Sequence, residues 1–170
     1  MTLVFADAYA AGTSTEDKVK AGLIFNFINF TRWPEHAFPL ENERYILCVA
    51  GEDHYSEIFD AIPDLSVRGR KLQLKHLEKL QDKSTIQSCH ILIVGLKNRT
   101  QVSQLLGQIK DSPVLTIGES VPLDTMITFV NKGNKVGFAI NRTRAAHSGI
   151  KFSSKMLRLA IEVTGRGPDA

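Results

Sequence analysis

The sequence has no long apolar run and little imbalance of charge. Its apolar stretches all fall well short of the about 18–20 residues that a membrane-spanning helix needs. Lys and Arg number 21 and Asp and Glu 18, and the resulting net charge of +3 is too small to predict a nucleic-acid-binding or membrane-surface protein. Hydrophobic residues make up 43% and charged residues 23%, which is the composition of a globular chain. The length of 170 residues predicts one domain with a real core.

The usual signatures of enzymes are also missing. Residues 51–54, after the first predicted strand, read Gly-Glu-Asp-His, and two carboxylates at this turn would repel the phosphate that a glycine-rich loop binds. The central apolar run ends Val94-Gly95-Leu96, without the aspartate of a phosphate-accepting receiver domain. No G-x-S-x-G motif is present. These absences argue against nucleotide-binding, receiver and serine-hydrolase functions.

The histidines do not predict a metal site. They are His36, His54, His76, His90 and His147, and no two of them have H-x-x-x-H or H-E-x-x-H spacing. Cys89 precedes His90, but successive residues of a strand point to opposite faces, so these two side chains are not expected to form a Cys–His pair. We therefore predict no metal, no cofactor and no catalytic residues, and we expect that the protein is not an enzyme.

Residues 1–12 have some features of an export signal. The stretch 3–5 is apolar, and Ala8-Tyr9-Ala10 matches the A-x-A pattern that signal peptidases favour. The basic start and longer apolar segment of a full signal peptide are not present. Two interpretations stay open, namely the remnant of a signal peptide cleaved after Ala10 and a disordered segment.

The chain has only two cysteines, Cys48 and Cys89. Each lies in or beside an apolar run that is typical of a buried strand, so adjacent strands would bring the two sulfurs within bonding distance. In an exported protein we expect a disulfide, whereas in a cytosolic protein two buried thiols are the more common outcome. If they pair, they close a loop of about 42 residues, and the stabilisation is about 4 kcal/mol.

Apolar periodicity predicts alternating helices and strands. Helices are expected over Ser14–Trp33, where Val19, Leu23, Phe27 and Phe30 recur at helical spacing, over His54–Ile62 and Thr100–Lys110, and from Ser153, where Met156, Leu157, Ala160 and Val163 point inward. Strands are expected over Tyr45–Gly51, Lys71–Leu77, His90–Gly95 and Val114–Gly118, with a β-hairpin over Met126–Val130 and Lys135–Ile140.

This order of elements predicts an α/β fold. We expect a single compact domain over residues 13–165, with a mostly parallel, twisted sheet of about five to six strands, helices on both faces and the antiparallel hairpin at one edge. Residues 166–170 are expected to form a disordered tail.

Two groups of residues are candidates for binding. Arg32, Trp33 and Phe38 lie at the end of the first predicted helix, where an exposed Trp would make a protein-docking anchor and a buried one would pack beneath the sheet edge. The second group, Arg142, Arg144 and His147, follows the last strand of the hairpin, where the ends of an open sheet often bind ligands, so we expect an anion or an acidic partner there. A third basic stretch, from Arg68 to His76, is interpreted as the solvated side of a strand.

Eight short motifs in a fixed order give the chain a family resemblance. They are K-x-x-x-I-F-N-F-x-x-F-x-x-W-P (20–34), I-L-C-V-x-G (46–51), V-x-G-R-x-L (67–72), S-C-H-I-L-I-V (88–94), V-L-T-I-G (114–118), I-T-F-V (127–130), V-G-F-A-I-N (136–141) and S-S-K-M-L-x-L-A (153–160). Together they cover about residues 16–163, and the chain resembles the YfiR-like family of small exported bacterial proteins.

The resemblance implies a periplasmic regulator without enzymatic activity. Well-known members bind the periplasmic sensor domain of an inner-membrane diguanylate cyclase and hold it inactive, and an outer-membrane lipoprotein sequesters the regulator. Cyclic-di-GMP then rises and promotes biofilm formation. The resemblance also implies a disulfide between Cys48 and Cys89, whereas the second disulfide of better-studied members has no counterpart here. A homodimer is a further expected assembly. The alternative is a periplasmic binding protein for an anionic or aromatic metabolite.

Overall fold

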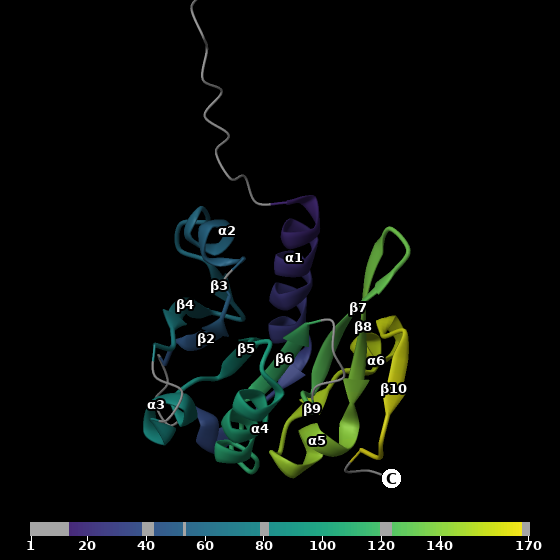
Figure 1. Ribbon diagram of the computed structural model, residues 1–170. Helices are drawn as coiled ribbons and strands as arrows, with labels where there is room; N and C mark the ends of the chain where they lie inside the picture. Colours follow the sequence, from purple (N-terminus) through teal and green to yellow (C-terminus); the bar gives the residue numbers. More distant parts are fainter. Residues whose placement is uncertain (1–13, 39–42, 53, 79–81, 120–123, 168–170) are drawn as a thin grey trace, which may run out of the picture.

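The computed structural model describes residues 14–38, 43–52, 54–78, 82–119 and 124–167 (Figure 1). Its strands are β1 (Thr31–Arg32), β2 (Tyr45–Gly51), β3 (Ser66–Val67), β4 (Arg70–His76), β5 (Ile91–Gly95), β6 (Leu115–Glu119), β7 (Ile127–Lys132), β8 (Lys135–Asn141), β9 (Lys151–Phe152) and β10 (Glu162–Thr164). Its helices are α1 (Thr15–Phe30), the 3-10 helix η1 (Glu35–Ala37), α2 (Ser56–Asp60), α3 (Lys83–Gln87), α4 (Arg99–Gln108), α5 (Arg142–His147) and α6 (Ser154–Leu159).

One large sheet organises the molecule (Figure 1). Its strand order is β10-β8-β7-β6-β5-β2-β4-β3, and β1 pairs with β9 in a separate two-stranded sheet. The central strands β4, β2, β5, β6 and β7 are parallel, β7 and β8 form an antiparallel hairpin, and β10 runs parallel to β8. The predicted mixed α/β class with a mostly parallel sheet is confirmed.

The sheet is wider than the sequence analysis expected. All six predicted strands are present, and the short strands β3 and β10 extend the sheet at its two ends. The β7–β8 hairpin is therefore followed outward by β10 instead of forming the edge itself. Strands of two or three residues carry no measurable alternation of apolar and polar residues, so the sequence pattern does not show them.

The two faces of the sheet bury separate cores, because successive strand residues point to opposite faces. On one face, Leu47 and Val49 of β2 pack with the buried side of α1 and with Met156 of α6. On the other face, Cys48 and Ala50 pack with apolar residues of α3 and α4. Helices cover both faces, as predicted.

The first helix ends three residues earlier than the predicted Trp33. Ser14 caps its start, but Thr31 leaves helical geometry, with φ −100° and ψ 141°. The reason is a long-range pairing, since Thr31 and Arg32 form β1 and lie opposite Phe152 and Lys151 of β9. Val19, one of the four apolar residues at helical spacing, is 45% exposed, because it lies beside the polar turn of the β7–β8 hairpin and not on the sheet.

The last helix is also shorter than predicted. It stops at Leu159, and Ala160 is extended, with φ −65° and ψ 139°. Met156 is buried as predicted, but Val163 is 39% exposed, so its predicted inward position is wrong. The physical reason is that residues 162–164 leave the helix to pair with β8 as the end strand of the sheet.

The sequence analysis made one prediction for each end of the chain, a signal-peptide remnant at the start and a disordered tail at the end. The signal-peptide interpretation concerns residues 1–12, which lie outside the described residues. Residues 166 and 167, the first of the tail expected to be disordered, contact α5. The backbone N–H of Arg166 donates to Thr143 Oγ1 at 3.1 Å, and Gly167 lies against the Arg142 guanidinium. No helix among the described residues is both long and apolar enough to cross a membrane.

Candidate functional site

An aromatic cluster lies where the chain leaves α1. The rings of Phe38 and His90 stack with centroids 4.3 Å apart and planes 4° apart. Tyr45 packs edge-on against Phe38 at 5.1 Å and tilted against Trp33 at 5.4 Å. Trp33 Nε1 donates a hydrogen bond to the carbonyl oxygen of His90 at 3.2 Å. Trp33 and Phe38 are half-buried, so they pack against the edge of the sheet and still reach the surface.

His90 holds this cluster in place. Its Nδ1 accepts a hydrogen bond from the backbone N–H of Ile46 at 3.0 Å, and its Nε2 lies 3.0 Å from the carbonyl oxygen of Ala37. Because Nδ1 is an acceptor, Nε2 carries the proton and donates a hydrogen bond to the carbonyl oxygen of Ala37, and the ring is neutral. Burial lowers the pKa of His90, which favours the same state. The imidazole thus links η1 to the start of β2.

Arginines from three segments surround the aromatic rings. The guanidinium of Arg70 lies 4.3 Å from the centroid of the Phe38 ring, and its Nη1 donates to the carbonyl oxygen of Glu43 at 2.9 Å. Arg68 Nη1 donates to the carbonyl oxygen of Thr31 at 3.0 Å. We define the helix-exit pocket as the surface pocket of about 310 Å³ lined by Arg32, Trp33, Phe38, Tyr45, Arg68 and Arg70.

The composition of this pocket differs from the sequence-based interpretation. Arg68 and Arg70 were assigned to the solvated side of a strand, and instead they line a pocket with Trp33. The V-R-G-R sequence at 67–70 contains the signal, because its glycine permits a tight turn between short strands. The turn lies beside the end of α1 through a tertiary contact, and no local sequence pattern shows such a contact.

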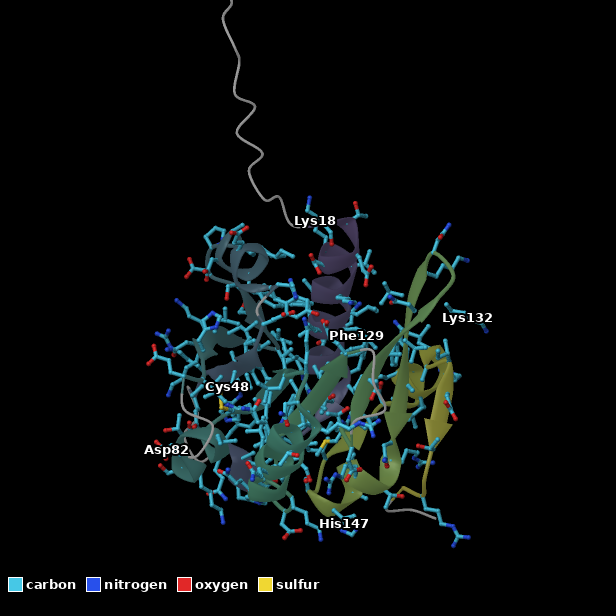
Figure 2. All side chains as sticks on the ribbon, viewed as in Figure 1. Lys18, Cys48, Asp82, Phe129, Lys132 and His147 are labelled. Atoms are coloured by element: carbon cyan, nitrogen blue, oxygen red, sulfur yellow. A yellow bond between two sulfur atoms is a disulfide. The ribbon has the colours of Figure 1, made fainter. Side chains whose placement is uncertain are left out.

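The second candidate group does not form one site. Arg142, Arg144 and His147 all lie on α5, a helix that the sequence analysis did not predict. Arg144 forms an ion pair with Asp124 at 2.6 Å, and its Nε also donates to the Asp124 carbonyl oxygen at 3.0 Å. His147 is exposed at the end of the helix (Figure 2). A spacing of two residues places Arg142 and Arg144 on nearly opposite sides of the helix, and the ion pair with Asp124 holds Arg144 on its own side.

Arg142 instead shares a pocket with a residue of the first group. This α5–α6 pocket has a volume of about 330 Å³, and three cationic side chains line it, those of Arg32, Arg142 and Lys151. Phe152 and Leu157 supply apolar surface and Ser153 a hydroxyl. Arg142 is therefore separated from Arg144 and His147, which do not line this pocket, and Arg32 contributes to both the α5–α6 pocket and the helix-exit pocket.

The predicted disulfide between Cys48 and Cys89 is present. It joins β2 to Cys89, two residues before the adjacent strand β5, with a Cα–Cα distance of 5.9 Å (Figure 2). Both cysteines are buried, with exposures of 0% and 2%, in the core beneath α3 and α4. A disulfide so far from the surface has the position of a structural cross-link.

The strand order reverses between β2 and β5, the place where open α/β sheets usually bind a ligand. Here the two backbones approach closely. A Cβ atom added to Gly51 would lie 2.7 Å from the carbonyl of Gly95, and the Glu52 N–H donates to the Gly95 oxygen at 3.3 Å. This contact leaves little space between the carboxyl ends of the two strands. Across the described ranges, no three His, Cys, Asp or Glu side chains gather to hold a metal ion.

Comparisons with known proteins agree with this architecture. A crystal structure of a conserved domain protein from Vibrio cholerae O1 biovar eltor is similar, with a TM-score of 0.55 at 12% sequence identity. The alignment covers 87% of this chain and 60% of the Vibrio chain, so it supports the fold alone. No curated protein matches the sequence. A family model described as YfiR/HmsC-like matches residues 17–161. The chain therefore belongs to the YfiR/HmsC-like family.

Proposed function

We propose that this protein is a periplasmic regulator that binds the periplasmic sensor domain of a membrane-bound diguanylate cyclase and keeps the cyclase inactive. Membership of the YfiR/HmsC-like family, a family of periplasmic regulators, carries this proposal. The buried Cys48–Cys89 disulfide suits an oxidising compartment. By restraining the cyclase, the protein limits cyclic-di-GMP and biofilm formation.

The helix-exit pocket is the proposed docking surface. Trp, Tyr and Arg are the residue types that contribute most binding energy at protein interfaces. Trp33 and Phe38 are each partly exposed, and the contacts of His90 and Tyr45 hold them in one arrangement. A surface that is already ordered loses little conformational entropy on binding, which favours affinity.

A binding experiment with the oxidised protein tests the regulator function. We expect the purified chain to capture the periplasmic domain of a cognate cyclase. Substituting the exposed Arg32 by Glu should weaken binding at least tenfold, about 1.4 kcal/mol. Arg99→Glu, on the exposed side of α4, is the matched control and should have no effect. Failure of the unmodified, oxidised chain to bind contradicts the proposal.

The family resemblance adds an outer-membrane lipoprotein as a second proposed partner, which sequesters the regulator and releases the cyclase.

Self-association is a third proposal. Among the described residues, the end strand β10 pairs with β8 alone, and three exposed apolar side chains lie just before or within it, namely Leu159, Ile161 and Val163. A bare apolar edge favours pairing with another strand, and a second copy offers the same edge. Sedimentation should show a dimer that Val163→Lys dissociates, and a monomer at all concentrations contradicts it.

The α5–α6 pocket supports a second candidate function, the binding of a small anionic or aromatic metabolite. Arg32, Arg142 and Lys151 give it positive charge, and Phe152 gives it an apolar wall. We expect such a metabolite to raise the melting temperature by several degrees and Arg142→Ala to abolish the shift. His147→Ala, at the exposed end of α5, should leave the shift unchanged. A screen in which no anionic or aromatic compound raises the melting temperature contradicts this function.

A further inference from the structure

The β3–β4 turn contains a residue in an unfavourable backbone conformation. Val67 lies opposite Arg70, so the turn consists of Arg68 and Gly69. Their φ angles are 53° and 80°, which is the left-handed region at both positions. Two-residue hairpin turns of this kind favour Asn or Gly at the first position, because other side chains clash with the backbone there. An arginine at this position therefore costs stability, and an interaction of its side chain must compensate for that cost.

The side chain of Arg68 extends from the turn to the helix-exit pocket. Its Nη1 donates to the Thr31 carbonyl oxygen at 3.0 Å, which holds the guanidinium at the rim, next to Trp33 and Tyr45. A guanidinium has five N–H donors. Among the described residues, Arg68 makes this one hydrogen bond and no ion pair, and the residue is exposed. Most of its donors are available to a ligand.

The charge of the pocket indicates what the ligand is. Of the six described residues that line it, three are arginines and none is acidic, while Trp33, Phe38 and Tyr45 provide apolar surface. Residues in unfavourable backbone conformations, as Arg68 is, are found most often at functional sites. A planar guanidinium beside aromatic rings is suited to a carboxylate, which it binds through two parallel hydrogen bonds.

We propose that the helix-exit pocket binds the carboxylate of an acidic side chain on a protein partner, with Arg68 as the ion-pair donor and Trp33 and Tyr45 as the apolar floor. This inference rests on the proposed docking function and adds the chemistry that the partner must present. The pocket is open at the surface between the end of α1 and the β3–β4 turn, so a side chain of a docked protein can reach it.

Trp33 is the only tryptophan of the chain, so its fluorescence reports on this pocket directly. The probe is a tripeptide of Glu, Phe and Glu blocked at both ends, with its Gln-Phe-Gln counterpart as the uncharged comparison. We expect saturable quenching by the acidic peptide and at least fivefold weaker binding of the uncharged one. Arg68→Asn should weaken binding of the acidic peptide at least fivefold while leaving the melting temperature equal or higher, because Asn suits the left-handed conformation.

Lys71→Asn, on the same hairpin, is the matched control and should bind the acidic peptide like the unmodified protein. The inference is overturned if both peptides bind equally, or if Arg68→Asn lowers the melting temperature and leaves binding intact. If benzoate binds the pocket as tightly as the acidic peptide does and displaces it, the site is assigned to a free carboxylate, and the inference of a protein partner is overturned. If the unmodified protein does not bind the cyclase but binds the acidic peptide through Arg68, only the proposed function is contradicted. Cyclase binding that does not depend on Arg68 contradicts only this inference.

Discussion

A single imidazole connects the surface pocket to the core of the sheet. His90 directly precedes β5, and its ring lies beneath Phe38, with Nδ1 accepting from Ile46 and Nε2 donating to Ala37. Protonation of Nδ1 would place an N–H against the Ile46 N–H and remove one of these bonds. The arrangement of the helix-exit pocket therefore depends on the charge of a residue that is 4% exposed.

The sign of the resulting pH dependence follows from the lowered pKa of His90. Below about pH 6.5, the pKa of a free imidazole, the unfolded chain binds a proton that the folded chain excludes. The contribution of His90 to the free energy of unfolding should therefore be fully present above that pH. It should fall as the pH decreases toward the folded-state pKa of His90. Urea titrations between pH 7.5 and 5 measure it.

The variant His90→Asn isolates this contribution. Its side-chain oxygen can still accept from Ile46, but the stacking on Phe38 is lost, so we expect a loss of about 1–2 kcal/mol at pH 7 and a flatter pH profile. Burial raises the pKa of Glu119, whose effect has the opposite sign, but both proteins share it and it cancels in the difference. His36→Asn, at an exposed histidine, is the control. Equal slopes for His90→Asn and the unmodified protein contradict the assignment.

At the scale of elements, the carboxyl ends of β2 and β5 are in direct contact. A Cβ atom on Gly95 would lie 2.5 Å from the Glu52 carbonyl oxygen. This approach narrows the crevice between the two strand ends, which is the place where a doubly wound sheet usually binds its ligand.

Gly95→Ala tests this contact. Because backbone atoms cannot move aside as a flexible side chain does, we expect the free energy of unfolding to fall by about 1–3 kcal/mol. Gly107→Ala is the control, since nothing lies within 4 Å of the added methyl group on the exposed side of α4. That variant should gain about 0.5–1 kcal/mol from its better helix propensity. Similar stabilities in chemical denaturation for the two variants contradict the close approach.

At the scale of the whole molecule, the disulfide acts on the unfolded chain. Cys48 and Cys89 are 41 residues apart in sequence, so the bond restricts a long segment that includes β3, β4 and α3. The loop-closure entropy removed from the unfolded state corresponds to about 4 kcal/mol. That is a large share of the about 5–15 kcal/mol by which domains are usually stable.

We therefore expect full reduction to lower the melting temperature clearly. Calorimetry of the oxidised and reduced protein measures the difference, and the double variant Cys48→Ala and Cys89→Ala should melt near the reduced form. The reductant should not change the melting of the double variant, which provides the control. An unmodified protein that melts at the same temperature in both redox states shows that the cross-link does not stabilise the fold.

Local sequence patterns determined most of the framework. The apolar runs at 45–51, 90–95 and 114–118 are buried strands because only a parallel sheet with both faces covered accommodates continuous apolar residues. Ser14 and Asp17 form the capping box at the start of α1, as their spacing indicates. The two cysteines bond because their strands are neighbours, an outcome that the family resemblance also implied.

Only the tertiary structure decided which side chains share a surface. Arg68 meets Trp33 because β1 pairs with β9 and redirects the chain after α1, and because a tight turn places β3 beside that point. Arg142 lies with Arg32, while Arg144 turns to Asp124. These contacts join residues far apart in sequence, and periodicity reports only neighbours within a few turns of one element. The sequence thus specified the sheet and its cores, and tertiary packing specified which side chains line each pocket.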